Sequence, residues 1–356
     1  MTKYIAPRAK LLYHADRLAA IKAGQTPPPV NVEIDLSLRC SHGCSWCRFG
    51  YTHTRGPLAG KHSKPVGAIP GGDLMDGDLI DPILEQLSEA GVKSVTWTGG
   101  GEPTLHPRFD DIVRCADAWG LEQGLYTHGG HISDERAFLL KRTLKWVYVS
   151  LDECTREDFQ RSKGVDRFEQ VLEGICRLVI APGSATIGVG FLLHRRNVGQ
   201  IDHMVHLGRK LGVNYVQFRP VIAYSATEPG QLVEDVQWVN TAINGLRRYA
   251  GDSFVQADPW RFEAYRDWTG HGYPTCHWSA LQTVITPNGK VWRCTDKREH
   301  AGALLGDLTE ESFVAIWERA GGPCRVDSGC RVMCRGHVSN VTLDAIMTET
   351  EHVNFI

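Results

Sequence analysis

The chain has 356 residues, of which 42% are hydrophobic and 22% charged, and its formal net charge is -2. This length allows a large core and two domains, and the near-neutral charge lacks the basic excess typical of nucleic-acid-binding proteins. No run of about 18 apolar residues is present, so no membrane span is expected. The first ten residues lack the apolar segment of a secretion signal, which predicts a cytoplasmic protein. With 11 cysteines, a protein of this reducing compartment is expected to bind metals or clusters rather than form disulfides.

The N-terminal part predicts one helix and one strand. Residues 9–22 have apolar positions at helical spacing, and this helix is expected to pack on the outside of the first domain. Residues 30–38 alternate as a strand does and lead directly into Cys40. The long connection at residues 49–72 is rich in Gly, Pro and Thr, and we interpret it as a solvated loop or as a lid for an anionic substrate. The basic side chains of this region are Arg48, Arg55, Lys61 and Lys64.

Helices and strands alternate from residue 74 onward. Helices are predicted at residues 79–90, 110–119, 134–142, 168–180 and 201–211, and strands at 94–98, 124–127, 146–151, 186–193 and 215–220. With the first strand, this pattern makes six β/α units, which is typical of a parallel sheet with helical crossovers. A closed barrel of this kind has eight units. We therefore predict an α/β fold that is a partial (β/α)6 barrel, followed by a small C-terminal cysteine-rich domain, for which a resemblance described below implies cluster binding.

Four segments follow from this pattern. They are an N-terminal helix and linker (1–29), the partial barrel (30–225), a helical connection (226–269) and the cysteine-rich domain (270–356).

Three cysteines with C-x3-C-x2-C spacing follow the first strand: Cys40, Cys44 and Cys47. Their thiolates can hold three irons of a 4Fe-4S cluster and leave the fourth iron open for chemistry. A structural zinc site is the alternative, and it needs a fourth ligand. The nearby candidates for that ligand are His42, His53 and His62.

A run of glycines follows the second predicted strand, in the sequence Thr98-Gly99-Gly100-Gly101-Glu102-Pro103. Consecutive glycines at a strand end let the backbone approach a ligand closely. A nucleotide P-loop is not expected, because no Gly-Lys-Ser/Thr follows the run.

In these motifs the chain resembles the radical S-adenosylmethionine (SAM) superfamily. The three-cysteine loop, the aromatic Trp46 before its last cysteine, and Gly100-Gly101-Glu102 match that family in order and spacing. The resemblance implies that Cys40, Cys44 and Cys47 bind a 4Fe-4S cluster whose open iron is chelated by SAM. It further implies that an electron, from a donor such as flavodoxin or ferredoxin, cleaves SAM to a 5′-deoxyadenosyl radical that abstracts a substrate hydrogen.

The resemblance also assigns residues near SAM. The expected SAM-binding residues are Trp46, Gly100, Gly101, Glu102, Thr127, Ser150 and Asp152. His128 departs from the family pattern, which often has Asn there, and with His131 it is a candidate to touch SAM or substrate. Further candidates at strand ends are Arg195, Arg196, Asn197, Gln217 and Arg219. A purely structural role for Ser150 and Asp152, as a strand end and helix N-cap, is equally compatible with the sequence.

A second cysteine set lies near the C-terminus: Cys276, Cys294, Cys324, Cys330 and Cys334. The first two flank a hairpin that turns at Asn288-Gly289. This part resembles the SPASM/twitch extension of radical SAM enzymes, with Gly321 where the full pattern has another cysteine. The resemblance implies one auxiliary 4Fe-4S cluster held by Cys276, Cys294, Cys330 and Cys334, with Cys324 as the alternate ligand. A four-cysteine zinc site is the alternative. The remaining thiols are expected to be inert: Cys115, Cys154 and Cys176.

The substrate is a separate question, because the site and not the fold decides it. The chain resembles bacteriophage-encoded radical SAM isomerases of thymine hypermodification in residues 47–60 and in the segments CRGHVSNVTLDAI and EHVNFI. These enzymes convert a glycine that is attached to thymine through its nitrogen into one attached through its carbon. This resemblance implies modified DNA as partner and the host cytoplasm as location. The alternative enzyme is a peptide- or small-molecule-modifying maturase, although only about 29 residues precede the first strand, where peptide enzymes often have a recognition domain. A non-catalytic zinc-binding protein is the alternative from another class, and it leaves the glycine run and Trp46 unexplained.

Overall fold

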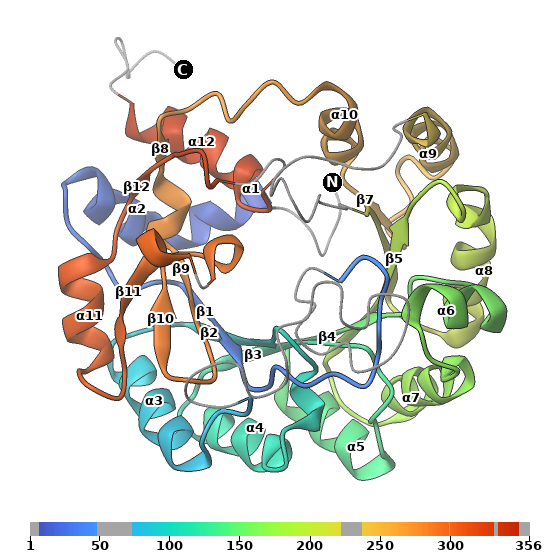
Figure 1. The fold of residues 1–356 in the computed structure, drawn as a ribbon, viewed down its shortest axis with the longest axis horizontal. Helices are drawn as coiled ribbons and strands as arrows, with labels where there is room; N and C mark the ends of the chain where they lie inside the picture. Colours follow the sequence, from blue (N-terminus) through green and yellow to red (C-terminus); the bar gives the residue numbers. More distant parts are fainter. Residues whose placement is uncertain (1–6, 48–72, 222–236, 299, 331–333, 349–356) are drawn as a thin grey trace.

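The computed structural model describes residues 7–47, 73–221, 237–298, 300–330 and 334–348. Ten strands form one curved sheet in the order β11-β10-β9-β1-β2-β3-β4-β5-β6-β7, and β12 pairs with β8 in a second, two-stranded sheet. Helices α3 to α8 lie along the outer face of the curved sheet, which remains an open barrel (Figure 1). The α/β fold with a partial parallel barrel is therefore confirmed.

The strands and helices have the following bounds. The parallel strands are β1 (Asn31–Asp35), β2 (Ser94–Thr98), β3 (Glu122–Thr127), β4 (Trp146–Ser150), β5 (Thr186–Leu193), β6 (Tyr215–Pro220) and β7 (Val255–Ala257). The later strands are β8 (Thr275–Cys276), β9 (Gln282–Ile285), β10 (Lys290–Trp292), β11 (Leu304–Asp307) and β12 (Cys324–Arg325). The helices are α1 (Pro7–Lys10), α2 (Ala15–Lys22), α3 (Gly77–Glu89), α4 (Phe109–Ala118), α5 (Asp134–Thr143), α6 (Arg156–Lys163), α7 (Phe168–Ile180), α8 (Ile201–Leu211), α9 (Trp238–Arg247), α10 (Pro259–Asp267), α11 (Phe313–Ala320) and α12 (His337–Met347).

Residues of each parallel strand alternate between two environments. Val32 and Ile34 of β1 belong to the hydrophobic core beneath the helices, whereas the intervening Glu33 is buried among polar groups. Because successive side chains of a strand point to opposite faces, the sheet has an apolar outer face and a polar inner face. By the same alternation, Tyr148 of β4 and Arg219 of β6 lie on the inner face, since adjacent residues of each strand belong to the apolar core.

Two elements of the barrel were missed by the sequence analysis. Helix α6 is strongly polar, so apolar periodicity did not reveal it, although Thr155 caps it by accepting a hydrogen bond from the amide of Asp158. This Thr-x-x-Asp pattern is the signal that could have found it. Strand β7 has three residues and pairs in parallel with β6. A strand this short gives no detectable alternation.

The C-terminal cysteine-rich part continues the sheet of the barrel. Strand β9 pairs in parallel with β1, with Asn31 opposite Gln282. The predicted hairpin at Asn288-Gly289 is present, because β10 returns antiparallel to β9 and Gly289 has a φ of 75°. The barrel and the C-terminal part thus share one sheet, although their sequences suggested separate units.

The N-terminal helical segment packs against the C-terminal part. Leu11, Leu18 and Ile21 form a small apolar cluster with Leu281 and Leu343. The expectation that this segment packs on the outside of the first domain is wrong, because its apolar partners come from η4 (His277–Ala280), the residue after it, and α12. Within the described residues, no helix is long and apolar enough to cross a membrane.

Candidate active site

The three-cysteine loop leaves β1 at the carboxyl end of the strand and is held by the end of α6. The amide of Gly43 donates to the carbonyl of Lys163 (2.7 Å), and the amide of Ser45 donates to the carbonyl of Ser162 (2.8 Å). A turn within the loop brings the amide of Cys47 to the carbonyl of Cys44 (3.1 Å). These backbone bonds fix the loop without using any cysteine thiol.

The glycine run after β2 packs directly against the start of this loop. The amide of Gly101 donates to the carbonyl of Ser37 (3.0 Å), and that of Glu102 donates to the carbonyl of Arg39 (2.8 Å). A Cβ atom on Gly101 would lie 2.2 Å from the Arg39 carbonyl oxygen. Glycine is therefore required for this close approach, which places the glycine backbone beside Cys40.

Glu102 is buried, and both of its carboxylate oxygens are occupied by protein groups. Oε1 accepts hydrogen bonds from the hydroxyls of Thr104 and Thr127 (both 2.6 Å), and Oε2 accepts one from the amide of His128 (2.8 Å). The pKa of Glu102 is lowered, because His128 and these hydrogen bonds outweigh the effect of burial, which acts in the opposite direction. Glu102 therefore ties the end of β3 to the glycine run, and the predicted residues Glu102 and Thr127 lie in direct contact.

Two histidines stack at the centre of the site. The rings of His42 and His128 are 3.9 Å apart and nearly parallel, and both side chains are buried. The Ser41 hydroxyl lies 3.1 Å from Nε2 of His128 and 3.1 Å from Nε2 of His131. The loop between Cys40 and Cys44 is thus packed onto the end of β3 through His42.

This histidine stack predicts a loss of stability in mild acid. Burial is the main reason that the pKa of His128 is lowered from 6.5 to about 4, while Glu102 opposes the shift. A ring that stays neutral in the fold stabilises it above pH 6.5, and that contribution is lost as the pH falls towards 4. We expect His128→Asn to reduce the slope of unfolding free energy against pH, between about pH 6.5 and 5, by about 1 kcal/mol per pH unit. Urea titrations of the cluster-free protein measure this slope.

The matched control for this prediction is His203→Asn, because His203 is an exposed histidine on α8. This variant removes a histidine but leaves the stacked rings in place, so a change in slope that is specific to His128→Asn reports on the buried ring. Equal slopes for His128→Asn and the wild type would contradict the prediction.

A buried ion pair stands between β4 and the cysteine loop. Lys163 donates to the carboxylate of Asp152 and to the carbonyl of Ser150 (3.2 Å), and Lys163 and Asp152 have only 2% and 1% of their side chains exposed. The Lys163 nitrogen also lies 5.6 Å from the centre of the Trp46 ring. Burial lowers the pKa of Lys163, but the charges of Asp152 and Cys44 outweigh this effect, so the pKa is raised. Lys163 was missed because it lies on the unpredicted α6.

Asp152 also helps to hold the backbone at the ends of β4 and β5. It has the left-handed φ of 63°, and its second carboxylate oxygen accepts the amide of Leu192 (3.0 Å). Asn197 donates to the carbonyls of Asp152 (3.3 Å) and Leu192 (2.9 Å). The two arginines before it, Arg195 and Arg196, are exposed.

The basic loop at residues 48–64, with His53 and His62, lies outside the described residues.

The second cysteine set gathers around the β8–β12 pair. Cys276 and Cys324 are opposite each other in that pair, and the interaction with the Cys276 thiol lowers the pKa of Cys324. Burial raises the pKa of Cys294 and of Cys334, and smaller contributions come from Cys324 to the pKa of Cys294 and from Cys294 to that of Cys334. Cys330 accepts the amide of Asp327 at 3.5 Å and lies beside Lys297. The structure therefore places Cys324, which the sequence ranked as the alternate, directly against Cys276.

The donor set fits iron–sulfur clusters. Each site offers at least three cysteine thiols, the ligand type that iron–sulfur clusters use. Among the described residues, no three Cys, His, Asp or Glu side chains converge as one metal ion would need. A four-iron cluster binds its thiolates on separate irons, so it accepts more widely spaced thiols.

The position of Cys324 gives a test of the auxiliary ligands. We expect Cys324→Ala to remove about four irons per chain, because Cys324 stands opposite Cys276, whereas Cys330→Ala leaves more iron bound. Iron and sulfide analysis after anaerobic reconstitution measures this, with Cys176→Ala on α7 as the control. Iron loss in Cys330→Ala but not in Cys324→Ala would contradict this prediction. It would instead support Cys330 as the cluster ligand and Cys324 as the alternate, as the sequence resemblance implies.

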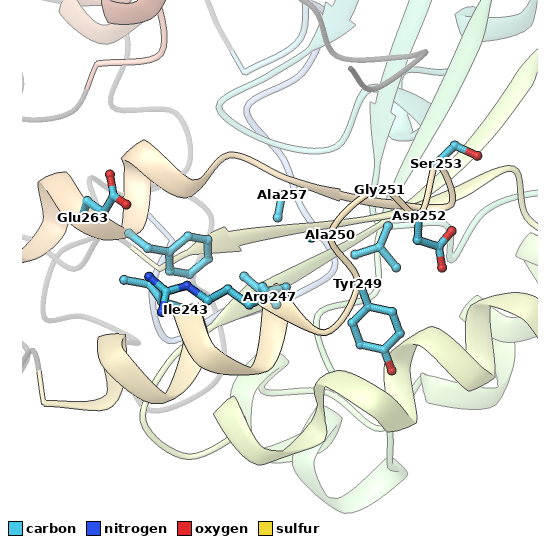
Figure 2. A pocket seen from close by; sticks show the side chains of 12 residues that line it. Ile243, Arg247, Tyr249, Ala250, Gly251, Asp252, Ser253, Ala257 and Glu263 are labelled. Atoms are coloured by element: carbon cyan, nitrogen blue, oxygen red, sulfur yellow. The ribbon is translucent and has the colours of Figure 1, made fainter.

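A separate surface pocket lies between α9, β7 and α10 (Figure 2). Its lining includes Ile243, Tyr249, Asp252 and Phe262 and contains none of the predicted cofactor residues. This pocket is therefore not part of the candidate active site.

Two family models match the chain. Residues 34–207 match the model of the radical SAM superfamily, and residues 276–322 match SPASM, an iron-sulfur cluster-binding domain. The first match contains the three-cysteine loop and the glycine run, and the second contains Cys276 and Cys294.

Individual proteins are also similar to the chain. The probable GTP 3',8-cyclase of Saccharolobus islandicus is 35% identical over 190 residues, 53% of this chain, and the chain spans only 56% of that relative. The mycofactocin maturase MftC of Mycobacterium tuberculosis is 28% identical over 302 residues, which are 82% of this chain and 71% of MftC. The structure of Streptococcus suis SuiB bound to the precursor peptide SuiA has a TM-score of 0.62 at 14% identity, covering 89% of this chain and 71% of SuiB. The last similarity shows a common fold.

Proposed function

The chain carries a radical SAM domain followed by a SPASM iron–sulfur domain, and we propose that it is a radical SAM isomerase acting on a glycine adduct of thymine in DNA. The observation that carries the radical part is the contact between the three-cysteine loop and the glycine run at the carboxyl ends of β1 and β2. When bound, a 4Fe-4S cluster and SAM supply a radical that can remove hydrogen from an unactivated carbon. One auxiliary cluster at the second cysteine set, and an electron donor such as flavodoxin or ferredoxin, complete the proposal.

The protein groups around this site have separate roles. The carbonyls of Ser162 and Lys163 hold the cysteine loop in place. Gly101 keeps the backbone close to the loop, so that main-chain groups are available to the amino and carboxylate ends of SAM. Glu102 fixes the end of β3 next to them. These groups position the cofactors, and the inner face of the barrel is left for the substrate.

The inner face supports a substrate with a flat ring and an anionic group. Tyr126 packs edge-on against the rings of Trp146 (4.9 Å) and Tyr148 (5.2 Å), and the guanidinium of Arg219 lies over Tyr148. Aromatic side chains can stack on a base that has left the DNA duplex. A glycine adduct adds a carboxylate to that base. The reaction breaks the bond between the thymine methylene and the glycine nitrogen, forms one from the methylene to the glycine α-carbon, and moves one hydrogen from that carbon to the nitrogen, without net oxidation.

A peptide substrate is the second candidate. It is favoured by the similarity to MftC, which is a maturase, over most of both chains. It is favoured also by the likeness in fold to SuiB, which was solved with a precursor peptide. The same hydrogen abstraction would then act on a peptide carbon.

One experiment separates the two candidates. The protein is reconstituted anaerobically with iron and sulfide and incubated with SAM, a reductant and an oligonucleotide carrying the glycine adduct, with unmodified DNA as control. We expect the adduct to stimulate 5′-deoxyadenosine formation and to yield a base of unchanged mass but altered fragmentation. Slow SAM cleavage that no modified DNA stimulates would reject the thymine substrate and favour the peptide candidate.

A further inference from the structure

Arg219 is an arginine inside the barrel for which the described residues supply no acidic partner. It lies on β6, its guanidinium carbon is 4.7 Å from the centre of the Tyr148 ring and 5.9 Å from that of Tyr126, and its Nε is buried without a hydrogen-bond partner. Within the described part of the chain, no carboxylate pairs with it. A buried donor without a partner is costly, so its presence indicates a group that arrives with a ligand.

Two other arginines, Arg298 and Arg335, differ from Arg219 because they pair with carboxylates. Arg298 pairs with Glu33 and with Asp35, each at 3.0 Å. Arg335 pairs with Glu33 as well. The acidic groups of β1 are therefore engaged by other arginines, and among the described residues they do not compensate the charge of Arg219.

The sheet around Arg219 is built to hold the two tyrosines beneath it. A Cβ on Gly190 would lie 2.0 Å from the Tyr148 hydroxyl oxygen, so glycine at this position of β5 makes room for the Tyr148 ring. Burial raises the pKa of Tyr148 to about 12, while the charge of Arg219 opposes the shift, so the phenol is neutral at physiological pH. The guanidinium thus lies over a neutral aromatic ring and also interacts with the Tyr148 hydroxyl, while its buried Nε is left for another acceptor.

A second guanidinium reinforces the positive charge at this point. Helix α10 packs against β6, and Arg261 of α10 has a lowered pKa, first because of burial and second because of the charge of Arg219. Its partner Asp258 lies 3.7 Å away and offsets only part of this effect. An anion bound between the two arginines would relieve their repulsion.

We propose that Arg219, stacked over Tyr148 and Tyr126 and supported by Arg261, binds a carboxylate or phosphate group of the substrate. This inference rests on the proposed function, because it assumes that the inner face of the barrel receives the substrate. Arg219 lies opposite Leu192 in the β5–β6 pair, and the Leu192 amide donates to Asp152. The site therefore lies at the carboxyl ends of the strands, on the same rim as the cysteine loop. A glycine adduct on thymine offers a carboxylate, and DNA offers a phosphate.

Binding to the anaerobically reconstituted protein tests the site without turnover. The probes are the glycine-adduct nucleoside of thymine, its carboxamide, thymidine 5′-phosphate and N-acetyltyrosine, and equilibrium dialysis gives each Kd. We expect Arg219→Met to weaken binding of the adduct nucleoside about 10- to 100-fold, Arg219→Lys to weaken it less, and the carboxamide to bind the wild type at least about 10-fold more weakly. The carboxamide should be insensitive to Arg219.

The matched control is Arg209→Met. Arg209 also stacks on an aromatic ring, at 5.4 Å from that of Phe254, but it pairs with Asp252 on the outer surface. This control should leave every Kd unchanged. Iron content and the melting temperature of each variant show that the fold is intact, and Arg219→Lys keeps the charge should the methionine variant fail to fold.

The outcomes distinguish the anion site from the proposed substrate. An Arg219-dependent Kd for thymidine 5′-phosphate alone would assign the site to phosphate. An Arg219-dependent Kd for N-acetyltyrosine alone would keep the anion site and reject the thymine substrate. If no probe binds the wild type, or if every Kd changes less than about twofold in Arg219→Met and Arg219→Lys, the anion site is refuted. Undiminished isomerisation of glycyl-thymine DNA by Arg219→Met would also refute it and leave the proposed function standing.

Discussion

Replacing Cys40, Cys44 or Cys47 by alanine is expected to reduce 5′-deoxyadenosine formation from SAM to the protein-free background. The three thiols are the only cysteines of the loop, and in the proposed site each would hold a different iron of a four-iron cluster, so the loss of one would leave an iron without a ligand. Iron should fall from about eight to about four per chain, since the auxiliary site is separate. Product chromatography and iron analysis measure the two effects.

Cys115→Ala is the matched control for these variants. Cys115 is a free, partly buried cysteine on α4 that packs against the hydrophobic core, away from the loop. It should keep both iron content and SAM cleavage. A triple variant of Cys40, Cys44 and Cys47 that still makes 5′-deoxyadenosine would refute the assignment of the loop.

Lys163→Met is expected to destabilise the cluster-free protein by about 3–5 kcal/mol, because it leaves the Asp152 carboxylate buried without its counter-charge. Both side chains are almost fully buried, so solvent screens the pair little. The end of α6 also anchors the cysteine loop through the carbonyls of Ser162 and Lys163, so the loop should become more mobile when the helix end shifts. Urea unfolding measures the free energy, and hydrogen exchange at Gly43 and Ser45 reports on the loop.

Two further variants make this prediction specific. The double variant Lys163→Met with Asp152→Asn should recover part of the stability, because no unpaired charge remains. Lys145→Met is the control, since Lys145 and Glu122 form an ion pair at 3.4 Å with 61% of each side chain exposed, and such pairs contribute at most about 1 kcal/mol. A loss of less than about 1 kcal/mol in Lys163→Met would show that the buried pair is not important for stability.

Local sequence patterns determined much of the fold. The strands Ser94–Thr98, Thr186–Leu193 and Tyr215–Pro220 and the helices Phe168–Ile180 and Ile201–Leu211 have the predicted bounds. Each combines a strong apolar pattern with a clear end signal, such as Gly212 after the last of these helices, which has a φ of 76°. The cysteine loop and the glycine run were recognisable for the same reason, since their function depends on residues that are adjacent in the chain.

The tertiary structure alone decided contacts between distant segments. Nothing in the local sequence indicates that β9 pairs with β1, or that Cys324 stands opposite Cys276, because pairing depends on how the whole chain folds back. The ion pair of Lys163 and Asp152 joins a helix that has no apolar period to the end of a strand. Arg219 was a candidate by its position on β6, but only the fold shows that the carboxylates of Glu33 and Asp35 pair with other arginines. A motif can thus be recognised from residues that are adjacent in the sequence, whereas the environment of a charged side chain depends on strands and helices that are far apart in the chain.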